Sequence, residues 1–477
     1  MQNILSYIFY IREGGNVMGS RTDLFENKGV FSAIMNLALP SVMGQIILVI
    51  YNMADTLFVG MSGSDAMITA VTVCMPAFMF LSAISNLFGV GASSVISRAL
   101  GKNEGQNASL AAAFALWGTI GVTAVYCLGA FLFADKFIDI LGGKMPGIHE
   151  NALSYLYAAV ILGGIPTAVS TTLSHIIRSR GYSLHASAGI AIGGVLNIAL
   201  DPLFMFVILP RGNEALGAAV ATALSNLCAL IYYIIVLIAK KKRFRMNFAP
   251  SREMFGHAIP KDVFSVGIAA CLMTLCENIS YAVLDNLMCA SGTAAQAGVG
   301  VAKKINMLAH CFVRGMSQGV LPLIGYNYAS GNRRRMMQVI RMTLMISVVI
   351  SLLCTTCSLT LAKPLVSLFI RTKGESLTYG AKFLRILSIG APFSALAYTV
   401  ISFFQATGRG KKSLILALLR KGIADIPLMF LLSALIPTYG IVAATPLTDV
   451  LCSIVAAILL MRFLKQHGTN KGAYAEA

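Results

Sequence analysis

Acidic side chains lie inside long apolar stretches of this 477-residue chain. A carboxylate at the centre of a bilayer costs about 2.5–3.5 kcal/mol on insertion scales, so such residues mark ion or substrate pathways. A desolvated carboxylate can take up a proton, and with neutral oxygens beside it can hold a small hard cation. The candidates for this chemistry are Asp55, Asp201, Glu277, Asp285, Asp425 and Asp449.

Two of these acids have polar neighbours at helical spacing. Asn197 precedes Asp201 by four residues, so the two side chains share one face of a helix, and Thr222 lies on the next apolar segment. Together with Asp55 they predict a site that binds a proton or Na⁺ as coupling ion. The alternative is a purely structural polar contact between helices, worth about 0.6 kcal/mol.

A second acidic site is predicted from Glu277 and Asp285 in the other half of the chain. Arg314 lies deep in the following apolar segment and is expected to pair with a carboxylate. Lys303 and Lys304 are expected to extend toward an interface, as long basic side chains do. Near the C-terminus, we expect Asp425 to pair with Arg420 or Lys421, and Asp449 to be structural.

The elements that carry these residues are membrane helices. The chain is 57% hydrophobic and 12% charged, with a mean hydropathy of +0.77. Soluble chains carry about 25% charged residues, so a soluble enzyme, a disordered chain and a secreted disulfide scaffold are excluded. A span needs about 20 apolar residues. Twelve spans are predicted, at 31–62, 67–97, 108–133, 152–177, 184–209, 215–240, 259–288, 294–328, 336–361, 378–404, 412–436 and 440–464.

The net charge of +18 is concentrated on one side of these spans. Of the 37 Lys and Arg residues, 26 lie near the termini and in alternate loops, with Arg420 and Lys421 counted in one of those loops. Basic loops face the cytoplasm, so both termini are predicted to be cytoplasmic. Anionic lipid accounts for such a charge without nucleic acid as a partner.

An internal repeat relates the two halves of the chain. A shift of about 230 residues places Asp55 on Asp285 and Gly101 on Gly331, and a slightly smaller shift places Gly181 on Gly408. Six spans separate the copies, so both keep one orientation, and transporters of this kind bind substrate between their halves. The predicted parts are a cytoplasmic N-terminal segment (1–30), a first lobe (31–240), a basic linker (241–258), a second lobe (259–464) and a cytoplasmic tail (465–477).

Motifs for several other functions are absent from the sequence. It contains no phosphate-binding loop of the G-x-x-x-x-G-K-[ST] type, no H-E-x-x-H and no G-x-S-x-G. We therefore expect neither ATP hydrolysis, an enzyme reaction, a cofactor nor a metal cluster. Residues 1–17 do not have the features of a signal peptide and are interpreted as an upstream extension or as the result of a mis-called start, with Met18 as the alternative first residue.

Several segments together resemble the multidrug and toxic compound extrusion (MATE) family, in particular its MepA-like bacterial branch. They are "LALPSVMGQIILVIYNMADTLFVG", "NLFGVGASSVISRALGKN", "LNIALDPLF", "GMSQGVLPLIGYNYASGN" and "FFQATGRGKKSLILALLRKGIADIPLMF". The resemblance covers roughly residues 30–465. It implies two six-helix lobes around a central cavity, which exchange a proton or sodium ion for lipophilic, often cationic drugs.

Carried over to this sequence, the resemblance implies that Asp55, after a bend at Pro40, is the cation-site aspartate of the first helix. Asn197, Asp201 and Thr222 are its implied partners. Glu277 resembles the seventh-helix glutamate of the NorM-like branch, but an apolar residue near Leu396 replaces the tenth-helix aspartate. Coupling through the first lobe is therefore expected, with protons favoured over sodium.

Two alternatives remain from the sequence. One is a flippase for lipid-linked oligosaccharides from the same superfamily, and the other is a membrane-embedded enzyme or scaffold. The acidic residues within twelve spans favour the exporter over the flippase, and the repeat disfavours the enzyme. The expected setting is the plasma membrane of a bacterium, where the protein would span the bilayer as a monomer.

Overall fold

The computed structural model describes residues 21–468, except 144, 146, 245, 257 and 371–373. The interpretation of residues 1–17 and of Met18 lies outside the described residues, as does the tail beyond 468. The described part of the chain is helical throughout, without strands. This is the predicted all-α class.

Twelve helical segments follow one another at the predicted places. The first six are α3 (Val30–Met61), α4 (Asp65–Gly101), α5 (Gly105–Leu132), α7 and α8 (Ile148–Tyr155, Gly164–Ser179), α9 (Ser183–Leu203) and α10 (Glu214–Ala239). The second six are α12 (Ile259–Cys289), α13 (Thr293–Ala329), α14 (Arg333–Thr360), α16 and α17 (Glu375–Ile389, Ala391–Ala406), α18 and α19 (Gly410–Leu418, Asp425–Leu435) and α20 (Tyr439–Gly468).

Shorter elements complete three of these spans and cap the ends of the molecule. π-Helical turns continue the spans at η1 (Leu156–Leu162), η2 (Phe204–Ile208) and η4 (Leu419–Ile423). The helices α2 (Arg21–Glu26), α6 (Ala134–Leu141), α11 (Lys241–Phe244) and α15 (Ala362–Ser367), with the 3-10 turn η3 (Arg252–Phe255), lie outside the long helices.

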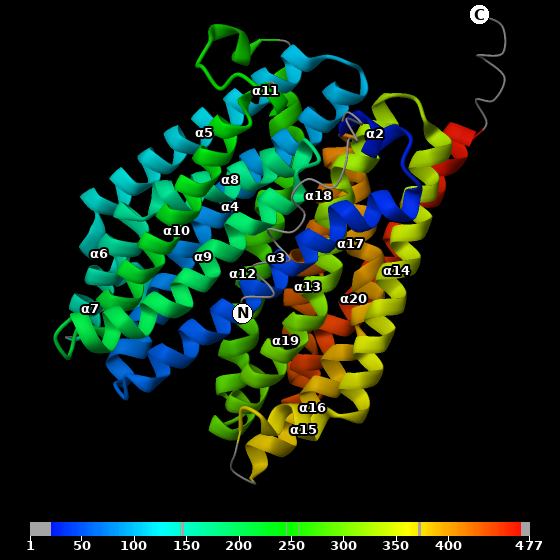
Figure 1. Ribbon diagram of the computed structural model, residues 1–477. Helices are drawn as coiled ribbons and strands as arrows, with labels where there is room; N and C mark the ends of the chain where they lie inside the picture. Colours follow the sequence, from blue (N-terminus) through cyan, green and yellow to red (C-terminus); the bar gives the residue numbers. More distant parts are fainter. Residues whose placement is uncertain are drawn as a thin grey trace, which may run out of the picture.

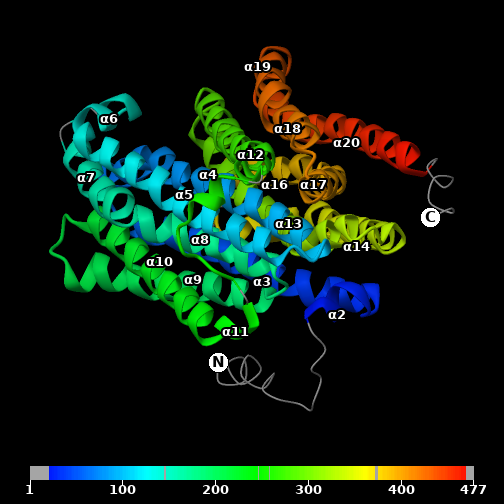
Figure 2. The same ribbon diagram turned by 90° about the horizontal axis from the view of Figure 1, so that it is seen from above.

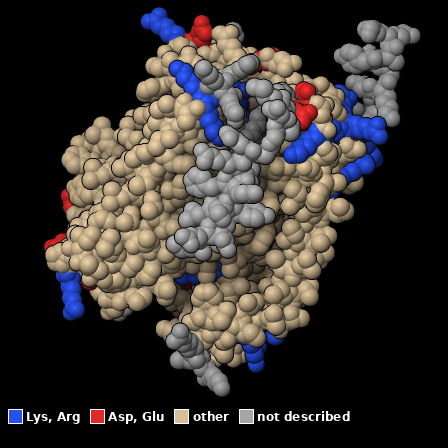
Figure 3. Space-filling view, in the orientation of Figure 1, with Lys and Arg blue, Asp and Glu red and all other residues tan. Residues whose placement is uncertain are grey.

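The outer faces of these helices suit a lipid environment. Within the described residues, eight helices are individually long and apolar enough to cross a membrane, and two bent pairs raise the number to ten. The remaining two spans, α13 and α18–α19, carry charged side chains midway. Large apolar side chains are widely exposed, such as Val125 at 73% and Leu162 at 76%. In Figure 3 the flanks are almost free of charge, and Lys and Arg gather mainly at the end that carries α2. We call this end the basic end and the opposite one the far end.

The repeat is visible in matching irregularities of the two halves. The span formed by α7, η1 and α8 bends by 46°, and the span of α16 and α17 bends by 44°. These bends lie at Gly163 and Gly390, which are 227 residues apart. Gly181 and Gly408 both have a positive φ, at 79° and 73°, so that predicted pair is structurally equivalent.

One predicted landmark of the repeat is shifted. Gly331 follows α13 with a φ of 78°, whereas Gly101 is still the last residue of α4. The left-handed residue after α4 is Asn103, with a φ of 61°. Asn tolerates this conformation better than most residues, so the position that corresponds to Gly331 carries no glycine in the first half.

The two groups of helices, α3–α10 and α12–α20, diverge toward the far end in Figure 1 and lie side by side in the view of Figure 2. Toward the basic end, α4 packs against α12 so closely that only glycine fits. A methyl group on Gly91 would lie 2.3 Å from the carbonyl oxygen of Val263, and one on Gly267 would lie 1.9 Å from that of Leu87.

The helices α3 and α13 form a second contact between the groups. A methyl group on Gly315 would lie 2.5 Å from the Cα of Val42, and one on Gly319 would lie 2.5 Å from the Cα of Ala38. Residue numbers rise along one helix as they fall along the other, so the two helices are antiparallel. The lobes are therefore joined by two glycine-lined helix pairs toward the basic end.

Polar contacts reinforce this closed end. Arg98 of α4 pairs with Asp262 of α12 at 3.3 Å. The ring of Phe25, next to the end of α2, stacks on Tyr326 of α13 with 5.0 Å between centroids. The Nε of Arg335 on α14 donates to the carbonyl oxygen of Phe25 at 2.7 Å. The basic end is thus sealed by both lobes and by the N-terminal helix.

Gly267→Ala is expected to lower the free energy of unfolding by about 1–3 kcal/mol, because α4 and α12 must separate to admit the methyl group. Gly300→Ala is the matched control, since a methyl group there meets nothing within 4 Å. Thermal unfolding followed by circular dichroism compares the two variants. Equal midpoints for both would contradict the close packing of α4 on α12.

Candidate functional site

The first-lobe site is held together by a central amide. The Nδ2 of Asn197 lies 3.2 Å from Oδ1 of Asp201 and 3.3 Å from Oγ1 of Thr222. All three side chains are buried, with Asp201 at 0% exposure. The structure thus brings together three of the residues that the sequence assigns to the cation site, on α9 and α10.

Two oxygens of this cluster are left without a protein partner. Oδ2 of Asp201 and Oδ1 of Asn197 are buried and accept no hydrogen bond from the described residues. Buried polar atoms in native proteins nearly always have a partner. A proton, a cation or an ordered water is therefore expected at these oxygens.

Asp55 approaches this cluster from α3. A methyl group on Gly194 of α9 would lie 2.9 Å from Ile47 and 3.3 Å from Tyr51, so α3 and α9 are in close contact one turn before Asp55. The charges of Asp55 and Asp201 act on each other. Two like charges in a buried site repel, so a proton or monovalent cation between them is stabilised.

Two tyrosines border this site. The hydroxyls of Tyr51 and Tyr155 both lie within the electrostatic field of the two aspartates. Tyr51 precedes Asp55 by four residues, so the spacing indicates it, but nothing in the sequence links Tyr155 of α7 to Asp55. Pro40 lies within α3, which continues through it as one helix.

Glu277 of the second lobe has a bound counter-charge. Arg314 Nη2 donates to both of its carboxylate oxygens, at 2.6 and 2.7 Å. The hydroxyl of Tyr398 lies 3.0 Å from the same nitrogen and 3.3 Å from Glu277. The expected carboxylate partner of Arg314 is therefore Glu277, and the guanidinium balances the negative charge of this acid.

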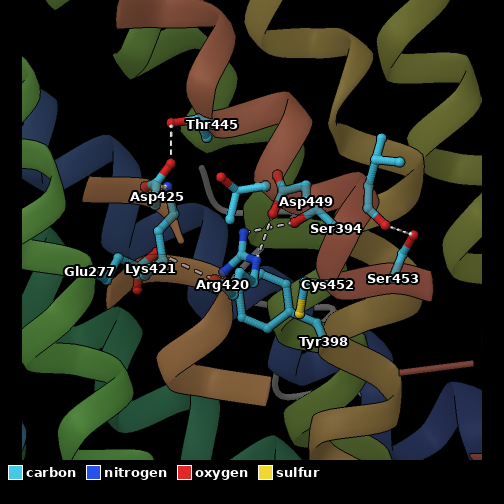
Figure 4. A network of polar contacts seen from close by, with 12 residues as sticks. Glu277, Ser394, Tyr398, Arg420, Lys421, Asp425, Thr445, Asp449, Cys452 and Ser453 are labelled. Carbon is cyan, nitrogen blue, oxygen red and sulfur yellow. Dashed lines mark hydrogen bonds and ion pairs between the residues drawn. The ribbon is translucent and has the colours of Figure 1, made fainter. Parts of the chain in front are cut away.

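Figure 4 shows a second ion pair of this lobe, between Arg420 and Asp449. Arg420 Nε donates to Asp449 Oδ1 at 2.8 Å, and its Nη2 donates to Ser394 at 2.8 Å. The guanidinium also lies over the ring of Tyr398, 4.1 Å from the centroid. Arg420 and Asp449 are each 2% exposed in their side chains. They form a fully buried pair.

A third pair begins at the neighbouring residue, Lys421. Lys421 donates to Asp425 at 3.0 Å, and Asp425 also accepts hydrogen bonds from Ser280 at 2.5 Å and Thr445 at 3.2 Å. The assignment of Arg420 and Lys421 to a basic loop was wrong. Both lie on η4 in the interior of a span, where their charge is tolerated because each has an acid partner.

The last pair joins Lys303 of α13 to Asp285 of α12. The two side chains lie 2.6 Å apart. Glu277 and Asp285 are thus held in separate ion pairs and do not form one acidic site. Leu396 packs against the hydrophobic core of the lobe. The polar groups of this region come from Tyr398 and Asp449, which no spacing motif in the sequence distinguishes.

The second lobe also encloses a cavity of about 10 Å³ lined by polar side chains. That volume has room for about one water molecule. Within the described residues, no group of three or more His, Cys, Asp or Glu could hold a metal ion. Any cation in the first-lobe site would therefore use the two aspartates and neutral oxygens.

Known proteins match the chain over most of its length. The multidrug export protein MepA of Staphylococcus aureus (strain MRSA252) is 29% identical over 450 residues, which cover 93% of this chain and 96% of MepA. MepA of Staphylococcus saprophyticus is 27% identical over 454 residues, again covering 93% of this chain and 96% of its own.

Solved structures have the same fold. A crystal structure of MATE in complex with MaL6 has a TM-score of 0.86 at 23% identity, covering 94% of this chain and 99% of that one. An outward-facing multidrug resistance MATE family transporter has a TM-score of 0.85 at 23% identity, covering 95% and 99%. The sequence model of the MatE family matches residues 40–203 and 267–431, one segment in each lobe. The resemblance inferred from the motifs is therefore confirmed, and the chain belongs to the MatE family.

Proposed function

We propose that this protein is an antiporter that exports lipophilic, often cationic drugs or toxic compounds in exchange for a proton or sodium ion. The names of its relatives support the substrate class, since they are multidrug export proteins. The two lobes, closed against each other toward the basic end, support alternating access. The proposal includes no enzyme reaction, no ATP and no cofactor.

The observation that carries the proposal is the unequal charge of the two lobes. Asp55 and Asp201 lie within the first lobe without an ion-pair partner among the described residues, and Oδ2 of Asp201 is unsatisfied. Glu277, Asp285, Asp425 and Asp449 each have a basic partner. Of these six acids, all within the described spans, only Asp55 and Asp201 are therefore available to bind an external cation.

Protons are favoured over sodium as the coupling ion. A buried carboxylate and a half-buried one within each other's field share a proton readily. Sodium would require both acids to be ionised and several oxygens to converge on it. The described cluster offers Asn197 Oδ1 and Thr222 as neutral ligands, so the sodium site would be sparse.

The orientation follows from the basic residues. Cytoplasmic loops carry an excess of Lys and Arg, so the basic end is proposed to face the cytoplasm of a bacterium, with both termini there. The far end, where the lobes diverge, would then open outward. The flippase alternative is disfavoured because the basic side chains Arg314, Arg420 and Lys421 are occupied by acids.

Proteoliposomes that contain the purified protein test this function. Without sodium, an imposed pH gradient is expected to drive ethidium uptake, and addition of ethidium is expected to release protons. Empty liposomes and an uncoupler serve as controls. Transport that begins only when a sodium gradient is added would assign sodium as the coupling ion. Ethidium movement that responds to neither gradient would contradict antiport.

A further inference from the structure

The N-terminal helix α2 directly precedes the first helix of the first lobe, yet it is bound by the second lobe. Nε of Arg335 on α14 donates to the carbonyl oxygen of Phe25 at 2.7 Å, and its Nη2 donates to that of Lys28 at 2.5 Å. Asn327 of α13 donates to the carbonyl oxygen of Phe25 as well, at 3.2 Å. The last carbonyl groups of a helix have no partner within the helix. The second lobe therefore supplies the C-terminal cap of α2.

The ring of Phe25 lies between the two lobes. It stacks on Tyr326 of α13 with an interplanar angle of 19°, and the hydroxyl of Tyr326 donates to Glu26. The same ring contacts the turn between α8 and α9, since a methyl group on Gly181 would lie 3.1 Å from its Cε2. Phe25 is 3% exposed. It thus touches the second lobe through its ring and its backbone, and the first lobe through the edge of its ring.

The repeat gives the second lobe a matching contact. Gly408 is the equivalent of Gly181, and a methyl group on it would lie 2.6 Å from Nη1 of Arg98. Arg98 comes from α4 of the first lobe and pairs with Asp262 of α12. Each left-handed turn at the basic end therefore receives a side chain that the opposite lobe carries. In this arrangement α2 takes the place of a part of the second lobe.

Separation of the lobes at the basic end must break one of the two sets of contacts that α2 makes. Residues 27–29 are all that joins α2 to α3 of the first lobe, and an extended chain spans at most about 3.3–3.6 Å per residue. The contacts with the second lobe include hydrogen bonds from a charged guanidinium, which are roughly twice as strong as neutral ones. The contact with the first lobe is apolar. The ring of Phe25 is therefore expected to leave Gly181 first, with residues 27–29 as the hinge.

We propose that α2 is a latch that moves with the second lobe and holds the basic end closed by docking the ring of Phe25 against the turn at Gly181. The inference rests on the proposed function, because a latch matters only if the lobes separate at this end. Arg335 is a positioning residue, since it holds the backbone of α2 so that the ring reaches the first lobe. The latch stabilises the state that is closed toward the basic end and must release once in every transport cycle.

The test measures the distance between two spin labels on the purified full-length protein in lipid. One label is placed at Lys102→Cys in the first lobe and the other at Arg334→Cys in the second, both exposed at the basic end. The background carries Ser in place of the two exposed cysteines, Cys289 and Cys357. A short distance reports the closed basic end and a long distance the open one. The ratio of the two populations is recorded at different pH values and sodium concentrations, and with ethidium.

Phe25→Ala removes the ring from the seam between the lobes. The ratio of open to closed protein is expected to rise about tenfold, which corresponds to about 1.4 kcal/mol of lost contact. Arg335→Gln releases α2 from the second lobe, so the ratio is expected to shift in the same direction. Gel filtration of each variant establishes that it is folded. If Phe25→Ala fails to fold, Arg335→Gln decides, and an unchanged ratio in it would overturn the latch.

Phe244→Ala is the matched control. Phe244 of α11 is also buried and stacks on a tyrosine, Tyr182, with 4.3 Å between centroids. This stack joins α11 to the residue before α9, so it does not link the two lobes, and its loss should leave the ratio unchanged. If the wild-type ratio responds to pH, sodium or ethidium but Phe25→Ala has the same ratio, the latch is overturned and the proposed function stands. A single distance that responds to none of these conditions would contradict both proposals.

Discussion

Asp55→Asn is expected to abolish uphill ethidium efflux. An amide has the shape of the carboxylate but cannot alternate between a charged and a neutralised form, so the drug and the coupling cation no longer compete for it. The change removes one of two like charges and breaks no ion pair, so thermal stability should stay close to that of the wild type. Efflux from cells that express the variant, measured against membrane abundance, gives the result.

Asp139→Asn is the control for this experiment. Asp139 is a half-exposed acid outside the long helices, near His149, and its loss should leave efflux intact. Full gradient-driven efflux by Asp55→Asn at normal abundance would remove Asp55 from the mechanism. Passive movement of ethidium down its own gradient is compatible with loss of coupling, so the assay must record accumulation against a gradient.

Asp449→Asn is expected to destabilise the protein strongly. It leaves the guanidinium of Arg420 buried without its acid, and loss of one partner of a buried ion pair costs about 3–5 kcal/mol. The second-lobe pairs share Tyr398, which contacts both Arg314 and Arg420, so the disturbance should reach Glu277. Thermal unfolding in detergent measures the effect as a large fall in the midpoint.

The double variant Arg420→Met with Asp449→Leu separates charge from packing. Replacing a whole buried pair by apolar side chains of similar size is often nearly neutral, so most of the lost stability should return. If the double variant is as unstable as Asp449→Asn, the hydrogen bonds of Arg420 to Ser394 and its stacking on Tyr398 matter more than the charge balance.

The fold was accessible from the sequence because a membrane helix has a local signature. Twenty apolar residues predict a span whatever the rest of the chain does, and matching glycines predict the repeat. The grouping of Asn197, Asp201 and Thr222 was equally accessible, since two of the three are one helical turn apart and the third follows on the adjacent helix.

The second-lobe pairs were predictable only in part. The partner of Arg314 required knowledge of how α12 packs on α13, and Arg420 was misplaced because it follows a basic loop by only a few residues. Spacing along the chain predicts which residues share a helix face. The choice of acid for each base depends on contacts between helices, which the sequence does not reveal, as the pairing of Arg420 with Asp449 in place of Asp425 illustrates.

The pairing of charges in the second lobe has a consequence for membrane voltage. The bases Lys303, Arg314, Arg420 and Lys421 are balanced by four acids, which leaves Asp55, Asp201 and Lys304 with one net negative charge. One monovalent cation or one monocationic drug cancels this charge. The steps in which the transporter carries the cation inward or the drug outward would then move no net charge. A return of the empty transporter from the outward-facing to the inward-facing state would move this negative charge toward the inside of the cell. The membrane potential is negative inside, so this step would cost about 2.3 kcal/mol per 100 mV. The resting potential would therefore disfavour the return of the empty transporter, which is the step that would allow drug export without inward movement of the coupling ion.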